Sequence, residues 1–280
     1  MSGWDFGISV YGLHIGIHLS SEDFRDLVLD HLPPGWQFAS PYGVSRVYTL
    51  ETGKGEHRLY VDGTLLYFHR SFDEILRWFE SDLQIYVAEM CPDRVFVHAG
   101  VVGWRGKGIV LPGRSFSGKT TLICSLLRAG AEYYSDEYAV FDKHGRIHPY
   151  PRRLGVRSHD GVRTRRKVED FDAANGAGSL PASLIVATRF ILGAEWNPRR
   201  LSPGCAALLL FSNTVSARRS PDFALSTIRR AVAGAVALES ARGESDEIVD
   251  LLLNELADEE MEDYVSQREE QRICSSGTRA

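Results

Sequence analysis

Cysteine is scarce in this sequence of 280 residues, and its four cysteines are scattered along the chain. No two of them have the C-x-x-C spacing typical of zinc ligands or of a redox motif. We therefore expect reduced thiols, with neither a structural zinc site nor a disulfide framework. The cysteines are Cys91, Cys124, Cys205 and Cys274.

Long apolar runs are missing as well. No segment reaches the roughly 18 apolar residues that a transmembrane helix needs. The opening residues, MSGWDFGISVYGLHIGIHLSS, have neither the basic region nor the small-residue cleavage site of a secretory signal. These absences favour a cytoplasmic protein, with no membrane among its partners.

Charge of one sign is also lacking, since 32 Lys and Arg residues against 37 Asp and Glu residues leave a net charge of −5. This balance gives no general attraction to nucleic acid, which is not expected as a partner. With 44% hydrophobic residues and no internal repeat, the chain suits one large domain or a catalytic domain with a smaller one. The composition is compatible with a homo-oligomer and does not decide the oligomeric state.

The most informative stretch is residues 107–129, KGIVLPGRSFSGKTTLICSLLRA, which has the pattern of a strand, a glycine-bounded loop and a helix. Residues 113–120 match G-x-x-x-x-G-K-[ST], the phosphate-binding P-loop motif. The residues expected to bind the cofactor are Gly113, Arg114, Ser115, Phe116, Ser117, Gly118, Lys119, Thr120 and Thr121.

Each part of this motif has a chemical role. The two glycines let successive backbone N–H groups point at phosphate oxygens, and the helix dipole adds positive potential there. Lys119 is expected to bridge the β- and γ-phosphates, and the Thr120 hydroxyl to ligate Mg²⁺, with Thr121 as a weaker candidate. The motif therefore predicts ATP and Mg²⁺ as cofactors.

The first ninety residues predict a small α+β unit. Residues 7–19 alternate in polarity, which predicts one half-buried strand, and residues 20–32 predict a capped amphipathic helix. His14 and His18 would share a strand face but lie roughly 13 Å apart, too far to hold one metal ion. Short strands are expected at 45–50, 57–61 and 64–68, with Asp62-Gly63 as the turn of a hairpin.

A second hairpin leads into the P-loop after a helix expected over 71–90. If Arg105-Gly106 occupy its two turn positions, Trp104 pairs with Lys107, and counting outward places His98 opposite Gly113. A shift of one step places His98 opposite Ser115. In either register His98 lies beside the phosphates, which makes it a candidate catalytic residue.

After the P-loop helix, residues 131–134 predict a short strand that runs into Asp136 and Glu137. A right-handed βαβ crossover would make this strand parallel to the P-loop strand, so both carboxylates would emerge at the phosphate edge. One carboxylate can hold Mg²⁺ and one can accept a proton from a hydroxyl acceptor. The alternative is a solvated turn that happens to be acidic.

The rest of the chain carries weaker signals. Residues 138–148 predict another hairpin, and the polar stretch 158–180, with its Arg163, Arg165, Arg166 and Lys167, predicts a mobile loop that is either a lid, an acceptor-binding loop or a solvated insertion. A buried strand at 184–188 ends at Arg189. Helices are expected at 203–213 and 221–235. Arg189, Arg199 and Arg200 are candidates to reach the transferred phosphoryl group.

The runs VFVHAGVV, GIVLPGRSFSGKTTL and YYSDEYAVFD together resemble the catalytic domain of the HPr serine kinase/phosphorylase family, including the HPr-kinase-like enzymes of lasso-peptide clusters. The resemblance covers roughly residues 91–157. It implies a P-loop kinase core of the HPr kinase/phosphoenolpyruvate carboxykinase-like type. By motif position, the family's strand histidine matches His98, its P-loop lysine and hydroxyl match Lys119 and Thr120, and its catalytic aspartate matches Asp136.

The sequence departs from this family in two places. A glutamate that helps to hold metal in the family lies in a segment resembling residues 149–157, but this chain reads HPYPRRLGV there, without an acid. The family's carboxyl-terminal motif linked with dephosphorylation has no clear counterpart. The resemblance therefore implies a kinase, and it implies neither phosphorylase activity nor HPr as the acceptor.

The sequence as a whole predicts an α/β protein with three segments: a small α+β unit at 1–90, a P-loop kinase domain at 91–255 and a polar tail at 256–280. The expected function is an ATP- and Mg²⁺-dependent phosphotransferase acting on a hydroxyl, with serine of a peptide or small protein as the first candidate acceptor. Asp136, His98 and Lys119 are the expected catalytic residues, and Thr120, Asp136 and Glu137 the expected metal ligands.

Two other functions fit the same motif. The chain could be a kinase of a small-molecule hydroxyl, or a nucleotide-sensing P-loop protein that transfers nothing. ATP turnover with and without candidate acceptors would separate a kinase from a sensor.

Overall fold

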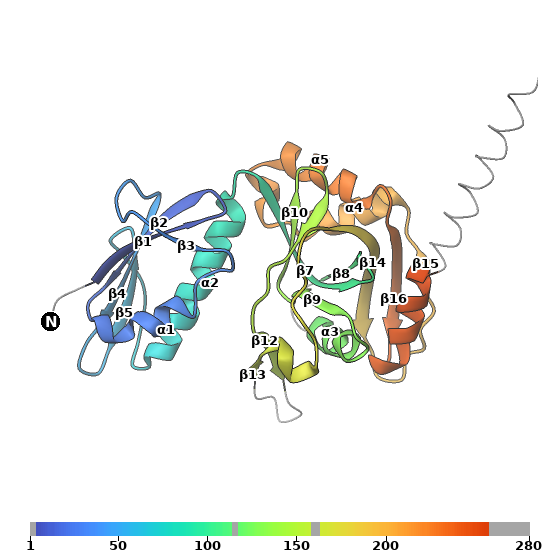
Figure 1. The fold of residues 1–280 in the computed structure, drawn as a ribbon, viewed down its shortest axis with the longest axis horizontal. Coiled ribbons are helices and arrows are strands. Elements are labelled where there is room, and N and C mark those ends of the chain that lie inside the picture. The colour runs from blue at the N-terminus through green and yellow to red at the C-terminus, as the bar shows by residue number, and fades with distance from the viewer. Residues whose placement is uncertain (1–3, 114–116, 158–162, 258–280) are drawn as a thin grey trace, which may run out of the picture. The chain divides into compact units, whose positions relative to one another are not determined.

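The computed structural model describes residues 4–113, 117–157 and 163–257, and it shows a mixed α/β protein with several sheets (Figure 1). This agrees with the α/β class expected from the sequence. Backbone contacts divide the chain into two compact units: one holds residues 1–96, 140–143 and 214–227, and the other holds the remaining segments. The three consecutive domains expected from the sequence stay a prediction.

The first unit is built on a six-stranded sheet in the order β3-β1-β2-β4-β5-β6. The stretch 7–19, expected as one strand, is a hairpin, because the chain turns at Tyr11 and Gly12 with φ angles of 47° and 76°. The alternation shifts phase at this turn: the buried apolar residues have even numbers before it (Ile8 and Val10) and odd numbers after it (Ile15 and Ile17). This shift is the sign of the hairpin in the sequence. The strands are β1 (Trp4–Val10), β2 (Leu13–Leu19), β3 (Gln37–Ala39), β4 (Arg46–Thr52), β5 (His57–Val61) and β6 (Thr64–His69).

Other expectations for this unit are closer to the structure. Asp62 and Gly63 form the β5–β6 turn with φ angles of 49° and 79°, as the two-residue hairpin rule predicts. His14 and His18 both lie on β2, and the His18 ring contacts the carboxylate of Asp5 across the hairpin. The helix expected at 20–32 is shorter: a 3-10 turn at Glu22–Phe24 leads into α1 (Arg25–Leu29).

Helix α2 (Phe72–Met90) packs against β4, β5 and β6 through the apolar face that the sequence predicts. Its buried apolar side chains recur at steps of three and four residues: Phe72, Ile75, Leu76, Phe79, Leu83, Tyr86 and Val87. The short helix η3 (Val215–Arg218) also contacts α2 within the same unit.

The larger, eight-stranded sheet has the order β11-β10-β7-β8-β14-β16-β15, with β9 also paired to β7. Strands β8, β14 and β16 run parallel to one another. The β7–β8 hairpin has the predicted register, with Trp104 opposite Lys107 and the turn at Arg105 and Gly106. The strands are β7 (Arg94–Trp104), β8 (Lys107–Pro112), β9 (Glu132–Ser135), β10 (Tyr138–Asp142), β11 (Arg146–His148), β14 (Leu180–Phe190), β15 (Arg199–Arg200) and β16 (Val236–Arg242).

The strand that follows the P-loop helix is placed differently from the simple βαβ prediction. Strand β9 does not pair with β8; it pairs with β7 in antiparallel fashion, and the parallel neighbour of β8 is β14. Strand β9 still runs in the direction of β8, because both are antiparallel to β7. The residues after β9 therefore emerge at the same edge as the end of β8, with one strand between them.

The polar stretch 158–180, expected as a loop, contains regular structure. Strand β13 (Arg163–Arg166) pairs with β12 (Leu154–Arg157), and the 3-10 helix η2 (Val168–Phe171) follows. Val168 and Phe171 are buried, which anchors the segment to the core. The apolar anchors are too few and too widely spaced to show a periodic pattern against the arginines around them. Residues 158–162 lie outside the described residues.

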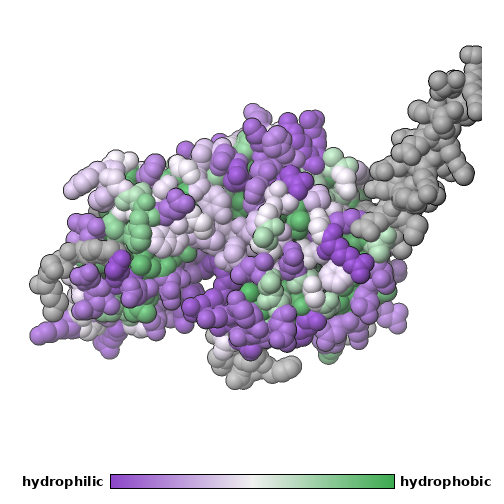
Figure 2. All heavy atoms as spheres, in the orientation of Figure 1, coloured by the Kyte–Doolittle hydropathy of each residue, from purple (hydrophilic) through white to green (hydrophobic). Residues whose placement is uncertain are grey.

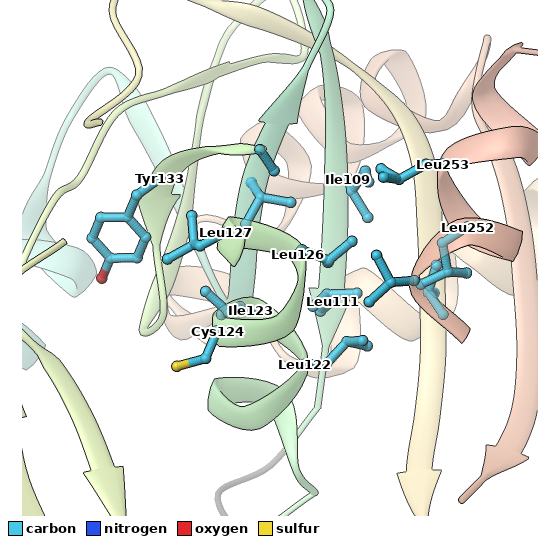
Figure 3. Close-up of a cluster of buried hydrophobic side chains, with 14 of the residues drawn as sticks. Ile109, Leu111, Leu122, Ile123, Cys124, Leu126, Leu127, Tyr133, Leu252 and Leu253 are labelled. Atoms are coloured by element: carbon cyan, nitrogen blue, oxygen red, sulfur yellow. The ribbon is translucent and has the colours of Figure 1, made fainter. Parts of the chain in front are cut away.

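The core of the second unit lies around α3 (Lys119–Arg128), as Figure 3 shows. Leu122, Leu126 and their neighbours on α3 meet Ile109 and Leu111 of β8, while Leu252 comes from a helix at residues 246–257. Neither β16 nor this last helix was expected from the sequence. Helices α4 (Pro203–Ser212) and α5 (Pro221–Val232) match the expected 203–213 and 221–235 within a few residues.

Among the described residues, no helix combines the length and the apolar character needed to cross a membrane. Of the polar tail expected at 256–280, only residues 256 and 257 are described, and both belong to the last helix.

Candidate functional site

The P-loop motif lies between the end of β8 and the start of α3. Gly113 and Gly118 both have positive φ angles, 152° and 86°, and Gly118 caps α3 in the left-handed conformation. A Cβ atom at Gly118 would lie 2.6 Å from Nη2 of Arg242, so a larger residue there would strain the backbone and displace the guanidinium group. Arg114, Ser115 and Phe116, expected to bind the cofactor, lie outside the described residues.

Lys119, the first residue of α3, folds back over the loop. Its Nζ donates a hydrogen bond of 2.6 Å to the carbonyl oxygen of Gly113. Partial burial lowers the pKa of Lys119, while the negative charges of Glu137 and Asp136 act in the opposite direction. The lysine, both carboxylates and the first glycine of the motif therefore lie close enough to interact electrostatically.

His98 lies on β7 where the register prediction places it. The N–H of Gly113 donates a hydrogen bond of 3.4 Å to the carbonyl oxygen of His98, one step beyond the ladder pair Ala99 and Pro112. The Nδ1 atom of His98 is 3.8 Å from Oε1 of Glu137, and its ring centroid is 4.8 Å from that of Tyr138.

The charge state of His98 follows from these neighbours. Burial lowers the pKa of His98, Glu137 opposes this shift and Lys119 adds to it. The lowered pKa favours the neutral imidazole at neutral pH.

Asp136 follows β9 and is held by two donors. Its Oδ2 accepts a hydrogen bond of 3.3 Å from the N–H of Gly155, and its Oδ1 accepts one of 3.3 Å from the hydroxyl of Tyr133. Loss of water raises the pKa of Asp136, and the nearby Glu137 raises it further. A raised pKa makes this carboxylate a better proton acceptor than a fully solvated aspartate.

Oxygen donors for Mg²⁺ are present near this lysine. Thr120 is in the first turn of α3, and Asp136 and Glu137 stand close to Lys119, so the three expected ligands would supply hydroxyl and carboxylate oxygens, which Mg²⁺ prefers. Thr121, the weaker candidate, is exposed. A group of three or more His, Cys, Asp or Glu side chains arranged to hold a metal does not occur among the described residues.

None of the three arginines proposed from the sequence is shown at the P-loop. Arg199 pairs with Glu239, and Arg200 pairs with Glu255 at 2.6 Å; both are exposed. Arg189 is exposed near the end of β14.

The arginine at the P-loop is Arg242, the last residue of β16. It is 1% exposed, and its Nη2 donates a hydrogen bond of 2.9 Å to the carbonyl oxygen of Gly118. Its burial lowers its pKa, opposed by Glu244, and within the described ranges it forms no ion pair. Arg242 is not among the residues predicted from the sequence, because residues 236–242 were not recognised as a strand. Its place at the end of a strand parallel to β14 is the signal that would have identified it.

Several buried polar atoms at this end of the sheet lack a hydrogen-bond partner within the part of the chain that the structure describes. Extending the register of Ile185 with Val110 places Thr188 opposite Gly113. Buried polar atoms are normally paired, so unpaired ones beside a P-loop fit a site that receives phosphate oxygens. These atoms are Ser117 Oγ, Thr188 Oγ1, Arg242 Nε and Ser245 Oγ.

Compared with models of known protein families and with curated proteins, the sequence has no significant match.

Proposed function

We propose that this chain is an ATP- and Mg²⁺-dependent phosphotransferase of the cytoplasm that phosphorylates a hydroxyl, with serine of a peptide or small protein as the acceptor. The eight-stranded sheet with the P-loop motif would then be a P-loop kinase core of the HPr kinase-like type. The G-x-x-x-x-G-K-[ST] motif and the strand-loop-helix context support this assignment.

The observation that carries the proposal is the cluster around Lys119. Lys119 lies close enough to the carboxylates of Asp136 and Glu137 for their charges to interact. The imidazole of His98 lies 3.8 Å from Glu137 at the same edge of the sheet. A nucleotide-binding site alone needs the lysine and the loop, but it does not need a carboxylate with a raised pKa beside them. This carboxylate favours a kinase over a nucleotide sensor.

Each residue has a role in the transfer. Asp136 accepts the proton of the acceptor hydroxyl while the oxygen of that hydroxyl bonds to the γ-phosphorus. The bond between the γ-phosphorus and the β-γ bridging oxygen breaks, which releases ADP. Lys119 binds phosphate oxygens, and the imidazole of His98 lies beside Glu137, with Nδ1 3.8 Å from Oε1. Thr120, Asp136 and Glu137 would hold Mg²⁺, which would supply positive charge to neutralise the phosphates.

The direct test of this function is Lys119→Ala. The substitution should remove most of the affinity for Mg·ATP and all phosphoryl transfer, because the amino group bridges the β- and γ-phosphates in the P-loop mechanism. Binding is measured by titration calorimetry, and folding by circular dichroism.

The matched control is Lys54→Ala, which removes an exposed lysine in the other unit. It should bind Mg·ATP like the wild type. Unchanged ATP affinity in Lys119→Ala would refute the assignment of a P-loop, whereas binding without transfer to any acceptor would favour the nucleotide sensor.

A further inference from the structure

A hollow of about 300 Å³ lies beside the candidate base Asp136, and its function is not accounted for by nucleotide binding. Three basic side chains and one acidic side chain line it. Its lining residues are Pro151, Arg152, Arg153, Lys167, Val168, Glu169 and Asn175. They come from the segment before β12 and from residues 167–175 after β13, in the stretch that the sequence predicts to be a lid, an acceptor-binding loop or a solvated insertion.

Two segments of the lining lead directly to Asp136. Arg152 and Arg153 precede Gly155, whose N–H donates a hydrogen bond of 3.3 Å to Oδ2 of Asp136. On the other side, Asn175 forms a β-bridge with Tyr133, whose hydroxyl donates a hydrogen bond of 3.3 Å to Oδ1 of Asp136. Both segments that bond to the candidate base therefore border the hollow.

The charge of the hollow contrasts with that of the whole chain. The protein carries a net charge of −5, whereas Arg152, Arg153 and Lys167 outnumber Glu169 in the lining. The surface around β12 and β13 is largely hydrophilic on the face shown in Figure 2. A local positive site on an acidic protein selects ligands with negative charge, and arginine is well shaped to bind carboxylates.

The hollow is also open. Arg153, Lys167, Glu169 and Asn175 are all exposed, unlike the lining of an enclosed pocket that buries most of a small molecule. An open, charged surface fits a chain segment that lies across it.

We infer that this hollow binds the acceptor, and that the acceptor is a peptide with carboxylates close to the serine that is phosphorylated. The inference rests on the proposed phosphotransferase function, and it specifies the substrate class. Acidic groups beside the serine would contact Arg153 and Lys167, and the serine hydroxyl would then lie toward Asp136.

Binding of synthetic peptides tests this inference without requiring transfer. The probes are two fluorescein-labelled peptides of glycine, serine and either glutamate or glutamine, identical in length and sequence otherwise, and the P-loop is saturated with Mg·ADP. Wild-type protein should bind the glutamate peptide roughly tenfold more tightly, because several exposed ion pairs of modest strength add up. The difference should shrink as salt is raised.

Charge reversal locates the site. Arg153→Glu and Lys167→Glu should each reduce the preference for the glutamate peptide roughly threefold or more, while the affinity for Mg·ADP stays at the wild-type value. The matched control is Arg229→Glu, which makes the same charge change at an exposed position of α5 outside the hollow. It should keep the preference, and thermal melting checks that every variant is folded.

Three results would overturn the inference: equal binding of the two peptides by wild-type protein, a preference that survives in Arg153→Glu and Lys167→Glu, or tighter binding of a single-stranded oligonucleotide of equal charge that is lost in these variants. In all three cases Mg·ADP binding would still support the P-loop. Failure of the proposed function itself would appear instead as loss of wild-type nucleotide binding, or as nucleotide binding without phosphoryl transfer to any acceptor.

Discussion

Individual residues at the end of β8 hold charges that have lost much of their contact with water. Burial raises the pKa of Asp136 and lowers the pKa values of Lys119 and His98, so the neutral form of each group is favoured. Arg242 is also buried, and it forms no ion pair among the described residues. Such an arrangement costs stability, because desolvated charges are expensive unless they are paired. Desolvated charged groups with shifted pKa values are typical of sites that bind phosphates and transfer protons.

Asp136→Asn separates binding from chemistry. The substitution keeps the size of the side chain and an oxygen that accepts from Gly155, but it removes the charge that takes the proton. Transfer should fall roughly 10²–10⁴-fold while Mg·ATP still binds. Initial rates and calorimetry on the same preparation measure the two effects. Weaker Mg·ATP binding that is partly restored by added Mg²⁺ would instead assign Asp136 mainly to the metal.

The same variant has an effect on stability whose sign follows from the raised pKa. The folded protein holds the proton of Asp136 above the ordinary pKa of 3.8, so stability from this group is present below that value and is lost as the pH rises through the raised pKa. Asp136→Asn should therefore raise the melting temperature at neutral pH and change it little near the ordinary pKa. A lower melting temperature at neutral pH would contradict net destabilisation by this carboxylate.

At the scale of elements, the start of α3 depends on a strand more than a hundred residues later in the sequence. Arg242, at the end of β16, bonds to the carbonyl oxygen of Gly118, which is also the first acceptor of the helix through the N–H of Leu122. The buried cation thus holds the helix N-terminus and adds positive potential where phosphate is expected to bind.

Gly118→Ala tests this contact. The added Cβ would lie 2.6 Å from Arg242 Nη2, and the φ angle of 86° strains any side chain. Gly178→Ala is the matched control, since Gly178 has φ of 79° with nothing within 4 Å of its Cβ position. The control should cost about 1–2 kcal/mol of unfolding free energy from backbone strain alone. Gly118→Ala should cost more.

The excess should disappear when Arg242→Ala is combined with Gly118→Ala, giving a coupling of about 0.5–3 kcal/mol in a double-mutant cycle from urea denaturation. A coupling of zero would show that the guanidinium does not press on the P-loop glycine.

At the scale of the whole molecule, the first compact unit is not a continuous piece of chain. It takes in residues 214–227, in which Ser216, Ala224 and Thr227 are buried, and η3 within this segment contacts α2. The helix that carries most of the apolar face of this unit is therefore covered partly by chain from far along the sequence.

Residues 1–96 expressed alone should consequently be less stable than the same residues in the intact protein, because the surface of α2 that η3 covers becomes exposed. Hydrogen exchange should show faster exchange across α2 in the fragment, and a hydrophobic dye should bind it more strongly. Equal protection of α2 in fragment and intact chain would contradict a stabilising role for residues 214–227.

The sequence by itself determined the features that depend on neighbouring residues. The Arg105-Gly106 turn and the pairing of Trp104 with Lys107 follow from the two-residue hairpin rule, and they are enough to bring the backbone of His98 to Gly113. The apolar face of α2 follows from its periodicity. Such signals lie within one element or one tight turn, where chain geometry leaves few choices.

Only the tertiary structure decided which elements meet across long stretches of chain. That β14 rather than β9 is the parallel neighbour of β8, and that Arg242 reaches Gly118, depends on strands separated by long connections. A few buried residues order the arginine-rich stretch before β14. These outcomes come from competition between distant surfaces for burial, which leaves no local pattern to read.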